Sequence, residues 1–571
     1  MKLSTNTYWG TNPYCKNQCI VVSLIDVSES ERKRISDNAN ASLEYLASNF
    51  RYKKQLIGTT FPDEIGLHIA HASLFILNYV RGDLDEYGFT NKLQNPSIYI
   101  EFHNPNLTVE AVKIILHMFL NFKNKNTKNY NEVLSKFWNL CRKEHPDFQA
   151  HALISSAKSR GLHFAPLGNR YWLYGMGVNS KIFFETSTIE DLRSPFKTDK
   201  TSGKYFFNSL GVPTANYQIA ESYDETLSAA IKIGFPCVIK PVRGGGGKGV
   251  TANIISMDQI PFAYKEAGKY LRKSKKIMVE RFVEGDDYRL ITVGGKFIAC
   301  VNRRAPFVIG DGINTIEELI HLQINQYRTL NLYESRYKRP MPVDAEVEEM
   351  LKLQDLSLDS VIPQGKSVKL RRNDNLSTGG SAKIIDNINP EVVLMAEKIS
   401  RQSGMYSLGI DYITTDISLS PFESGGNFIE INRTQGIDTL LAADYDVIKA
   451  GTIFLGESTN NIEIDLHIFH QSKLNKLVQN YSGENAVFLP NVIVQNGVRI
   501  DAKNLHFTNV VNKFLSDKSL LSGDIFASVE FINTNGIPIK NLRRIIIEKS
   551  SLTASIGEMF RHSKCTVVHM D

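Results

Sequence analysis

The stretch from Val361 to Ala382, VIPQGKSVKLRRNDNLSTGGSA, places two adjacent arginines before a loop of small residues. Arg371 and Arg372 carry forked guanidinium groups, whose paired N–H donors match the oxygens of a carboxylate or a phosphate. The loop from Ser377 to Gly380 adds hydroxyl groups and backbone N–H groups that no bulky side chain shields. The stretch therefore predicts a site that holds a negatively charged group.

A glycine-rich segment lies upstream, where Lys240 ends a strand-like apolar run and residues 243–250 follow as RGGGGKGV. Glycines let backbone N–H groups approach phosphate oxygens without a steric clash. This is not a Walker A loop, because Lys248 is followed by Gly249 rather than by Ser or Thr. It predicts a flap over a nucleotide, and a flexible surface hairpin is the alternative. The loop residues that we expect to contact the nucleotide are Gly245, Gly246, Gly247, Lys248 and Gly249.

A set of oxygen-bearing side chains lies further along the chain. Glu430 and Asn432 stand two residues apart in a strand-like run, so their side chains point to the same face. Asp411 and Asp416 lie in the segment before it, and either could complete an all-oxygen set suited to Mg²⁺. Magnesium is the usual partner of a nucleoside triphosphate. The alternative interpretation is a pair of solvated strand ends.

The sequence ERFVEGDD, from Glu280 to Asp287, has the arrangement of an adenosine clamp. Glu280 ends a strand-like run, and Asp287 follows seven residues later, beyond a turn. Backbone groups near Val283 would face the base, and a carboxylate would accept hydrogen bonds from the ribose hydroxyls. By itself the signal is weak, because many surface turns combine the same residue types.

In this order, these elements resemble the ATP-grasp fold and, within it, the ATP-grasp domain of cyanophycin synthetases. The resemblance extends over roughly residues 60 to 457. It implies an α/β (α+β) protein, with an N-terminal α/β domain before the ATP-grasp domain and a small α/β domain after it. The stretches that carry it are Asp199–Lys200, Lys204, Gly211–Pro213, Arg303–Gly312, Thr315–Ile320, Val368–Arg372, Gly409–Asp411 and Thr415–Ser418.

The resemblance also implies a role for each set of residues. In the family, ATP lies under the glycine loop, with lysines on its phosphates and a clamp around its adenosine. The residues implied to bind ATP are Lys200, Lys240, the five loop residues named above, Glu280, Val283 and Asp287. Two magnesium ions would be held by Asp411 or Asp416 together with Glu430 and Asn432.

The implied activity is that of an ATP-dependent carboxylate–amine ligase. A carboxylate would attack the γ-phosphate of ATP to give an acyl phosphate, and an amine would then displace phosphate to form an amide. Amino acids or short peptides are the implied substrates, and a small-molecule kinase or a non-catalytic ATP-binding scaffold are the alternatives. The reacting groups would be held by Arg371, Ser377, Gly379 and Gly380.

Three departures from the family pattern affect these expectations. The glycine loop has four consecutive glycines where the family usually has larger residues. The turn after Asn432 reads Arg433-Thr434-Gln435-Gly436, where the family typically has Pro-Gly. No Walker A motif follows in the tail, so we do not expect this chain alone to perform the two-step polymerisation of cyanophycin synthetase.

The composition is that of an ordinary folded protein, since 42% of the 571 residues are hydrophobic and 22% are charged. The net charge of +6 is small for this length and gives no reason to expect nucleic acid as a partner. The sequence has no apolar run long enough to span a bilayer, no signal-peptide core and no disulfide pattern among its six cysteines. We therefore expect a cytoplasmic protein without a membrane partner, either monomeric or a homo-oligomer.

The change of pattern along the chain predicts three domains. Residues 1–149 would form the N-terminal domain, and residues 150–458 the ATP-grasp domain with its lid. Residues 459–571 would form a C-terminal α/β domain, in which we find no catalytic motif.

Overall fold

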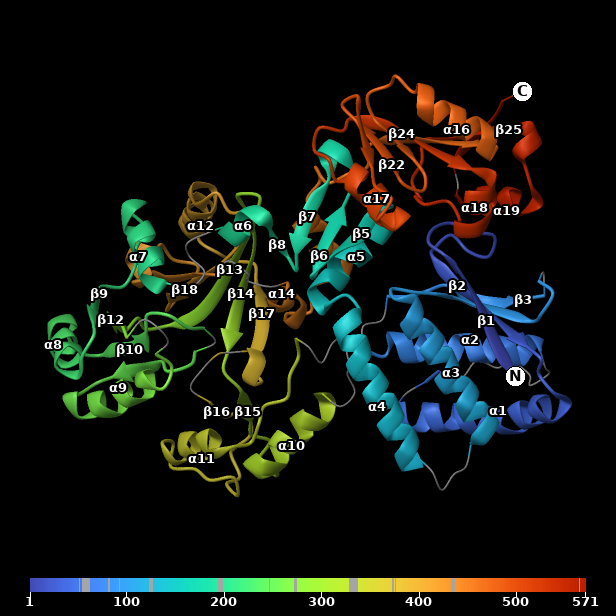
Figure 1. Ribbon diagram of the computed structural model, residues 1–571. Coiled ribbons are helices and arrows are strands. Elements are labelled where there is room, and N and C mark those ends of the chain that lie inside the picture. The colour runs from blue at the N-terminus through green and yellow to red at the C-terminus, as the bar shows by residue number, and fades with distance from the viewer. Residues whose placement is uncertain are drawn as a thin grey trace. The chain divides into compact units, whose positions relative to one another are not determined.

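The computed structural model describes residues 1–50, 52–53, 62–80, 83–91, 93–122, 127–193, 199–245, 247–271, 275–327, 337–371, 374, 376–432, 437–563 and 565–570. The chain forms two compact units (Figure 1). The central unit is Phe183–Gly456, and the terminal unit combines Met1–Ile182 with Glu457–Asp571. Both units mix helices and sheets, which confirms the expected α/β class. The boundaries of the three predicted domains stay a prediction.

A four-stranded antiparallel sheet begins the central unit, and two helices pack against it. Its strands, in spatial order, are β11 (Thr251–Ile254), β10 (Cys237–Pro241), β12 (Ile277–Arg281) and β9 (Tyr217–Ala220). The helices are α8 (Tyr223–Ile233) and α9 (Ile260–Gly268). Ala230, Ile239 and Ala263 belong to the shared apolar core. The glycine loop joins β10 to β11 and therefore leaves the edge of a well-packed layer.

A second antiparallel sheet in the central unit carries the carboxylates. Its strands, in spatial order, are β17 (Ser381–Ile385), β14 (Lys296–Arg304), β13 (Asp286–Val293), β18 (Ser407–Thr414) and β19 (Asn427–Asn432). Gly294 and Gly295, with φ of 59° and 77°, turn the chain between β13 and β14. Helix α12 (Pro390–Ser403) covers this sheet and begins at Asn389, whose side chain accepts a hydrogen bond from Glu391 N.

The rest of the central unit consists of a small lid and connecting helices. In the lid, strands β15 (Phe307–Ile309) and β16 (Ser367–Lys369) pair, and helices α10 (Ile316–Tyr327) and α11 (Ala345–Lys352) share their core. The other elements of this unit are β8 (Ser187–Thr188), α6 (Ile189–Arg193), α7 (Lys200–Ser209), α13 (Pro421–Ser424), α14 (Asp438–Ala442) and α15 (Val447–Leu455).

The N-terminal part of the terminal unit is an antiparallel sheet with helices. The strands, in spatial order, are β1 (Lys2–Tyr8), β2 (Cys19–Ile25), β4 (Ser97–Glu101) and β3 (Tyr87–Thr90). The helices are α1 (Glu29–Phe50), α2 (Asp63–Asn78), α3 (Pro105–Asn121), α4 (Thr127–Glu144) and α5 (Phe148–Arg160). The hairpin of β5 (Phe164–Gly168) and β6 (Tyr171–Tyr174) follows, and β7 (Lys181–Phe184) lies at the boundary between the units.

The C-terminal part is a mixed sheet of seven strands with helices packed on it. The strands, in spatial order, are β23 (Val498–Asp501), β22 (Val492–Gln495), β21 (Ala486–Phe488), β24 (Ser522–Ser528), β20 (Glu463–Phe469), β25 (Arg544–Glu548) and β26 (Thr566–Met570). The helices are α16 (Gln471–Asn480), α17 (Phe507–Leu515), α18 (Val529–Asn535) and α19 (Ala554–Ser563).

Backbone hydrogen bonds join the two ends of the chain within the terminal unit. Thr11 N donates to Ile537 O at 3.0 Å, and Ile537 N donates back to Thr11 O at 2.8 Å. Gly10 lies so close to this pairing that a Cβ atom there would stand 1.8 Å from Ile537 O. The close approach therefore requires glycine at position 10.

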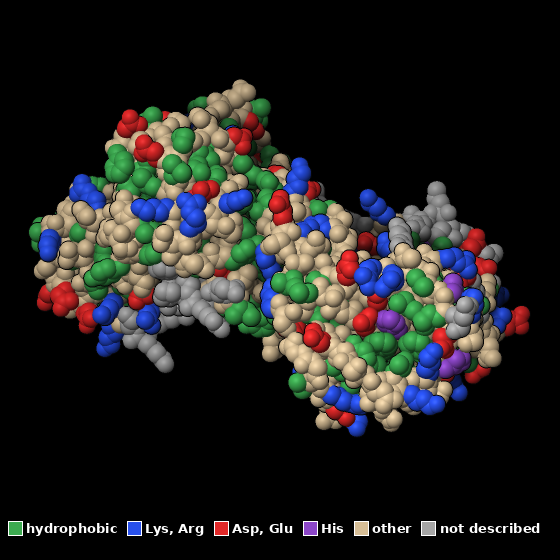
Figure 2. Space-filling model, turned by 90° about the horizontal axis from the view of Figure 1, so that it is seen from above, with side chains coloured by type: hydrophobic (Ala, Val, Ile, Leu, Met, Phe, Trp, Pro, Cys, Tyr) green, Lys and Arg blue, Asp and Glu red, His purple; other side chains and the backbone are tan. Residues whose placement is uncertain are grey.

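The surface and the cysteines are unexceptional. Figure 2 shows basic and acidic side chains interspersed over the face that it presents. All six cysteines are free thiols, and five of them are buried. Among the helices in the described part of the chain, none has the length and apolar character needed to cross a membrane.

Candidate active site

Three buried charged side chains meet where β10 and β12 lie side by side. Lys240 Nζ donates to Glu280 Oε1 at 2.7 Å, and Lys204 Nζ lies 2.9 Å from Glu280 Oε2. Val238 is the direct partner of Glu280 across the strands, so Lys240, two residues further on, shares that face of the sheet. Lys204 reaches the same point from α7 and is completely buried. One carboxylate thus holds two ammonium groups.

The charges of this cluster offset much of the cost of their burial. Burial opposes the ionisation of Glu280, but the ammonium groups of Lys240 and Lys204 outweigh it and lower its pKa. Burial lowers the pKa of Lys204. The negative charge of Glu280 opposes this shift, and the positive charge of Lys240 adds to it. With two cations on one anion, the cluster carries a net positive charge at the start of the glycine loop. A phosphate group would complete its charge balance.

Lys200 connects the glycine loop to the carboxylates of the second sheet. Its Nζ donates to Gly244 O at 2.8 Å and lies 3.7 Å from Glu430 Oε1. Asp199 fixes the start of α7 because its side chain accepts a hydrogen bond from Thr201 N at 3.0 Å. The loop, Lys200 and Glu430 are therefore neighbours.

The described part of the glycine loop is open. At Gly245 a Cβ would meet no atom within 4 Å, and Lys248 is exposed. Gly249 has φ of 71°, and a Cβ there would stand 2.9 Å from the Tyr270 ring, so this position requires glycine. Gly246 lies outside the described residues. Contacts between this loop and a nucleotide stay a prediction.

Asp411, Glu430 and Asn432 come together on β18 and β19. Asp411 is the direct cross-strand partner of Glu430, and Asn432 Nδ2 donates to Asp411 Oδ2 at 3.2 Å. Arg289 Nε and Arg303 Nη2 contact Asp411 Oδ1 at 2.6 and 3.2 Å. Burial disfavours the charged form of Asp411, but the two guanidinium groups outweigh it and lower its pKa. Asp411 is thus an ionised carboxylate at neutral pH.

This oxygen set has the chemistry of a magnesium site. Glu430 lies 3.7 Å from the Lys200 ammonium group, beyond hydrogen-bond length. The Glu430 side chain is 30% exposed. Carboxylate and amide oxygens are the donors that Mg²⁺ prefers. Glu430 with Asp411 and Asn432 therefore fits a divalent cation.

Asp416 lies apart from that set, in an exposed turn beyond the end of β18. Its carboxylate accepts hydrogen bonds from Ser418 Oγ at 2.7 Å and Ser418 N at 2.9 Å, and these lower its pKa. It lies five positions after Asp411, past the end of the strand at Thr414. The structure brings Asp411, and not Asp416, beside Glu430.

Asp287 pairs with an arginine of the chain itself. It lies directly opposite Arg303 on β13 and β14, and Arg303 Nη2 donates to both of its carboxylate oxygens at 2.7 Å. Burial raises the pKa of Asp287 to about 6. Val283 is half-buried in the connection between β12 and β13. A ribose hydroxyl would therefore have to share Asp287 with Arg303.

Arg371 is buried, and its guanidinium group holds the start of α11. Its Nη1 donates to Pro342 O at 2.9 Å, and the Asp344 carboxylate accepts from Nη1 at 3.1 Å and Nη2 at 3.0 Å. Glu346 Oε2 also accepts from Nη2, at 2.6 Å. Two carboxylates of the lid thus occupy the donors that we expected to hold a substrate. The catalytic role of Arg371 stays a prediction.

The loop after Arg371 packs closely on the lid. Gly379 has φ of 91°, and a Cβ there would stand 2.6 Å from Met341 Cα. Gly380 is half-buried beside it. The side chains of Arg372 and Ser377, and the turn at residues 433–436, lie outside the described residues.

Three charged residues of the site received no role from sequence reasoning. Lys204 and Arg303 stood within family-like stretches, but nothing in the local sequence pairs them with a carboxylate. Arg289 stands two residues after Asp287 on β13, so both point to one face, and its direct partner on β18 is Asp411. The alternation of side chains along this strand was the sequence signal that could have placed Arg289 on the same face as Asp287.

Comparisons with known proteins found similar sequences and structures. Residues 205–289 match the model of the ATP-grasp domain, a span that includes Lys240, Glu280 and Asp287. The chain is 34% identical over 303 residues to a cyanophycin synthetase of Crocosphaera subtropica, covering 51% of this chain and 34% of that one. It is 32% identical over 207 residues to a glutathione biosynthesis bifunctional protein of Streptococcus agalactiae, covering 34% of this chain and 26% of that one. A bifunctional glutathione synthetase from Pasteurella multocida aligns in structure with a TM-score of 0.39 and 19% identity, covering 58% and 49% of the two chains.

Residues 205–289 thus have the sequence pattern of an ATP-grasp domain. The chain resembles the cyanophycin synthetases over half of its length. The chain spans about a third of the length of these curated relatives.

Proposed function

We propose that the central unit is an ATP-dependent ligase that joins a carboxylate to an amine. The observation that carries the proposal is the continuous set of polar groups from Lys204, Glu280 and Lys240, through Lys200, to Glu430. At one end of this set, lysine ammonium groups lie where the phosphates of ATP would bind. At the other end, Glu430 supplies carboxylate oxygens that could bind a metal ion. ATP-grasp chemistry needs both ends.

Each end of the set has a distinct task. Lys200 and Lys240 bind the phosphates of ATP, and the glycine loop adds backbone donors and excludes water. Glu280 fixes the position of Lys240 and prevents repulsion between it and Lys204. Val283 and Asp287 hold the adenosine.

Asp411, Glu430 and Asn432 hold magnesium, and we propose two ions. A bound divalent cation neutralises charge on the transferred phosphate. The guanidinium groups of Arg289 and Arg303 keep Asp411 ionised, which a metal ligand requires. Asp416 has no part in this set.

The reaction has two steps. A substrate carboxylate oxygen attacks the γ-phosphorus of ATP, the bond to the β-phosphate oxygen breaks, and an acyl phosphate and ADP result. The nitrogen of an amine then attacks the acyl carbon, phosphate leaves, and the nitrogen loses a proton as the amide forms. The relatives are named for cyanophycin and glutathione synthesis, so amino acids or short peptides are the proposed substrates.

A kinase that transfers phosphate to a hydroxyl is the second candidate, because the same phosphate and metal groups would serve it. It would consume ATP with one co-substrate, whereas a ligase needs an acid and an amine. A cytoplasmic location and a homo-oligomeric state remain predictions.

The direct test is incubation with ATP, magnesium, and pooled amino acids and short peptides. Mass spectrometry should find a product lighter by one water than the sum of two substrates, formed with one ADP per product. Glu430→Ala should reduce ADP formation by about 10²-fold or more, since it removes a group that acts on the transferred phosphate. The matched control Glu457→Ala changes an exposed carboxylate and should leave the rate unchanged. An undiminished rate in Glu430→Ala would exclude the proposal.

A further inference from the structure

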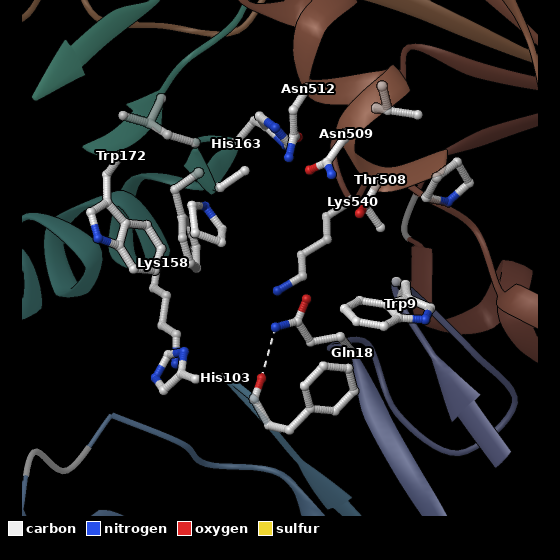
Figure 3. Close-up of a pocket in the computed structure, with 18 of the residues that line it drawn as sticks. Trp9, Gln18, His103, Lys158, His163, Trp172, Thr508, Asn509, Asn512 and Lys540 are labelled. Atoms are coloured by element: carbon white, nitrogen blue, oxygen red, sulfur yellow. Dashed lines mark hydrogen bonds between the residues drawn. The ribbon is translucent and has the colours of Figure 1, made fainter. Parts of the chain in front are cut away.

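A cavity of about 290 Å³ lies within the terminal unit, and none of the residues that line it belongs to the candidate active site (Figure 3). Its wall is formed by residues from both ends of the chain, including Trp9, Gln18, Trp172, Asn512 and Lys540. A cavity of this size accommodates a molecule about as large as an amino acid derivative or a dipeptide.

The wall is held in place by the backbone. Trp9 N donates to Asn535 O at 3.0 Å, next to the pairing of Thr11 with Ile537. The Trp9 ring also packs on His506, with 4.8 Å between ring centroids. The cavity is therefore preformed, so a ligand would not have to order its walls on binding.

Lys540 is a cation in this wall with no carboxylate of the described residues at ion-pair distance, because Glu101, which also lines the pocket, pairs with Lys158. Its Nζ donates to Asn17 Oδ1 at 2.7 Å and stands 5.6 Å from the centroid of the Phe164 ring. Among the described residues, no carboxylate oxygen lies within the 4.0 Å of an ion pair, whereas Lys158 has Glu101 and Asp85 at 3.5 Å. Figure 3 shows the Lys540 side chain reaching into the pocket. An ammonium group in such a place is costly unless an anion joins it.

The remaining wall limits what the anion can be. Trp9, Phe164 and Trp172 offer aromatic faces, and Asn512 offers an amide that can donate to an oxygen. One unpaired ammonium among aromatic rings matches a single negative charge on an apolar body better than a dianionic phosphate, which needs more donors.

We propose that this pocket binds a small carboxylic acid with an apolar, preferably aromatic, body, and that Lys540 holds its carboxylate. The site shares no residue with the proposed ligase site. Such a site would let the terminal unit recognise an acid or a capped peptide.

Tryptophan fluorescence can test the proposal, because two of the three tryptophans line the pocket. The third, Trp138, is buried elsewhere and donates to Ile76 O at 3.0 Å. The probes are N-acetyl-L-phenylalanine, N-acetyl-L-leucine and 3-phenylpropanoate, and the neutral control is N-acetyl-L-phenylalaninamide. We expect saturable quenching by at least one acid, at least tenfold tighter than the amide. The double variant Trp9→Phe/Trp172→Phe should lose the quenching signal, and Trp138→Phe should keep it.

The charge is tested by Lys540→Met, which keeps the length of the side chain, against Lys503→Met, a lysine whose side chain is 72% exposed. Acid binding should weaken at least tenfold in the first and stay unchanged in the second. Glu430→Ala should bind the acids as the wild type does, which separates this test from that of the ligase. Absence of saturable binding by all three acids, equal binding of the amide, or unchanged binding by Lys540→Met would overturn the proposal.

Discussion

Two lysines, one in each unit, show two ways to place an ammonium group away from water: Lys204 is completely buried, and Lys540 is half-buried. Lys204 contacts the Glu280 carboxylate, which also holds Lys240. Lys540 contacts a neutral amide, that of Asn17. Burial lowers the pKa of both lysines. A carboxylate at ion-pair distance opposes this shift at Lys204, whereas at Lys540 the opposing carboxylate, Glu101, lies beyond that distance. We infer that the first cluster contributes to the fold, whereas the second site is stabilised by its ligand.

The largest effect should come from removing the shared anion of the first cluster. Glu280→Gln leaves two ammonium groups buried without a carboxylate and should cost about 3–5 kcal/mol in the free energy of unfolding. Urea denaturation measures the change. Glu284→Gln, at an exposed position four residues away, should stay within about 0.5 kcal/mol of the wild type. A loss below about 1 kcal/mol for Glu280→Gln would show that the cluster does not support the fold.

A smaller loss should follow removal of one of the two cations. Lys204→Met replaces a completely buried ammonium group but leaves Lys240 on Glu280, so we expect destabilisation by about 2–3 kcal/mol. The same urea titration measures it. Stabilisation by Lys204→Met would make the two lysines equivalent and contradict the comparison.

The junction that forms the pocket depends on a glycine. Gly10→Ala places a methyl group against Ile537 O and should cost about 2 kcal/mol, because either backbone must move. Gly557→Ala is the control, since a Cβ there meets no atom within 4 Å in α19. Thermal melting should show the control as stable as the wild type or slightly more stable. Equal melting temperatures for Gly10→Ala and the wild type would mean that the junction is not closely packed.

The smallest effect, and of opposite sign, belongs to Lys540. Without ligand, Lys540→Met should stabilise the protein at pH 7 by about 1 kcal/mol, because it removes a half-buried charge that has no carboxylate of the described residues at ion-pair distance. Denaturation with and without the acid probes measures this, and the wild type should gain stability from the acid where the variant does not. Destabilisation of the ligand-free protein by the substitution would show that Lys540 is already compensated.

The pH dependence of stability tests independently whether Lys540→Met stabilises the ligand-free protein. Burial lowers the pKa of Lys540 from 10.5 to about 8. Repulsion by Lys158 and Lys16 acts in the same direction, whereas attraction by Glu101 and Cys15 opposes it. Between these two values the unfolded chain binds more protons at this group, so its contribution to stability rises with pH. The advantage of Lys540→Met should therefore shrink as the pH rises from about 8 toward 10.5.

Local sequence was sufficient to predict much of the central unit. The Gly-Gly pair at 294–295 and the Asn-Pro pair at 389–390 are strong local signals for a hairpin and for the start of a helix, and the structure has these elements there. The shared face of Glu430 and Asn432 follows from strand alternation alone. Elements with clear punctuation were therefore predictable.

Pairings between distant segments were not predictable in this way. The choice between Asp411 and Asp416 depends on the register of β18 against β19, which a single sequence does not contain. Arg371 pairs with Asp344 and Glu346, which lie 27 and 25 residues earlier in the chain. Local composition could not show that these carboxylates, rather than a substrate, accept its hydrogen bonds. The pocket combines Trp9 with Lys540, so no motif marked it.

Transfer of oxygen tests the central claim most directly. Acids labelled with ¹⁸O in the carboxylate, ATP, magnesium and unlabelled amines would be incubated with the protein in ordinary water, and the released phosphate analysed by mass spectrometry. Attack of the carboxylate on ATP predicts one ¹⁸O atom in each phosphate, and formation of that phosphate should be suppressed in Glu430→Ala. Phosphate without label, formed at the wild-type rate, would show that no acyl phosphate arises and would contradict the ligase mechanism.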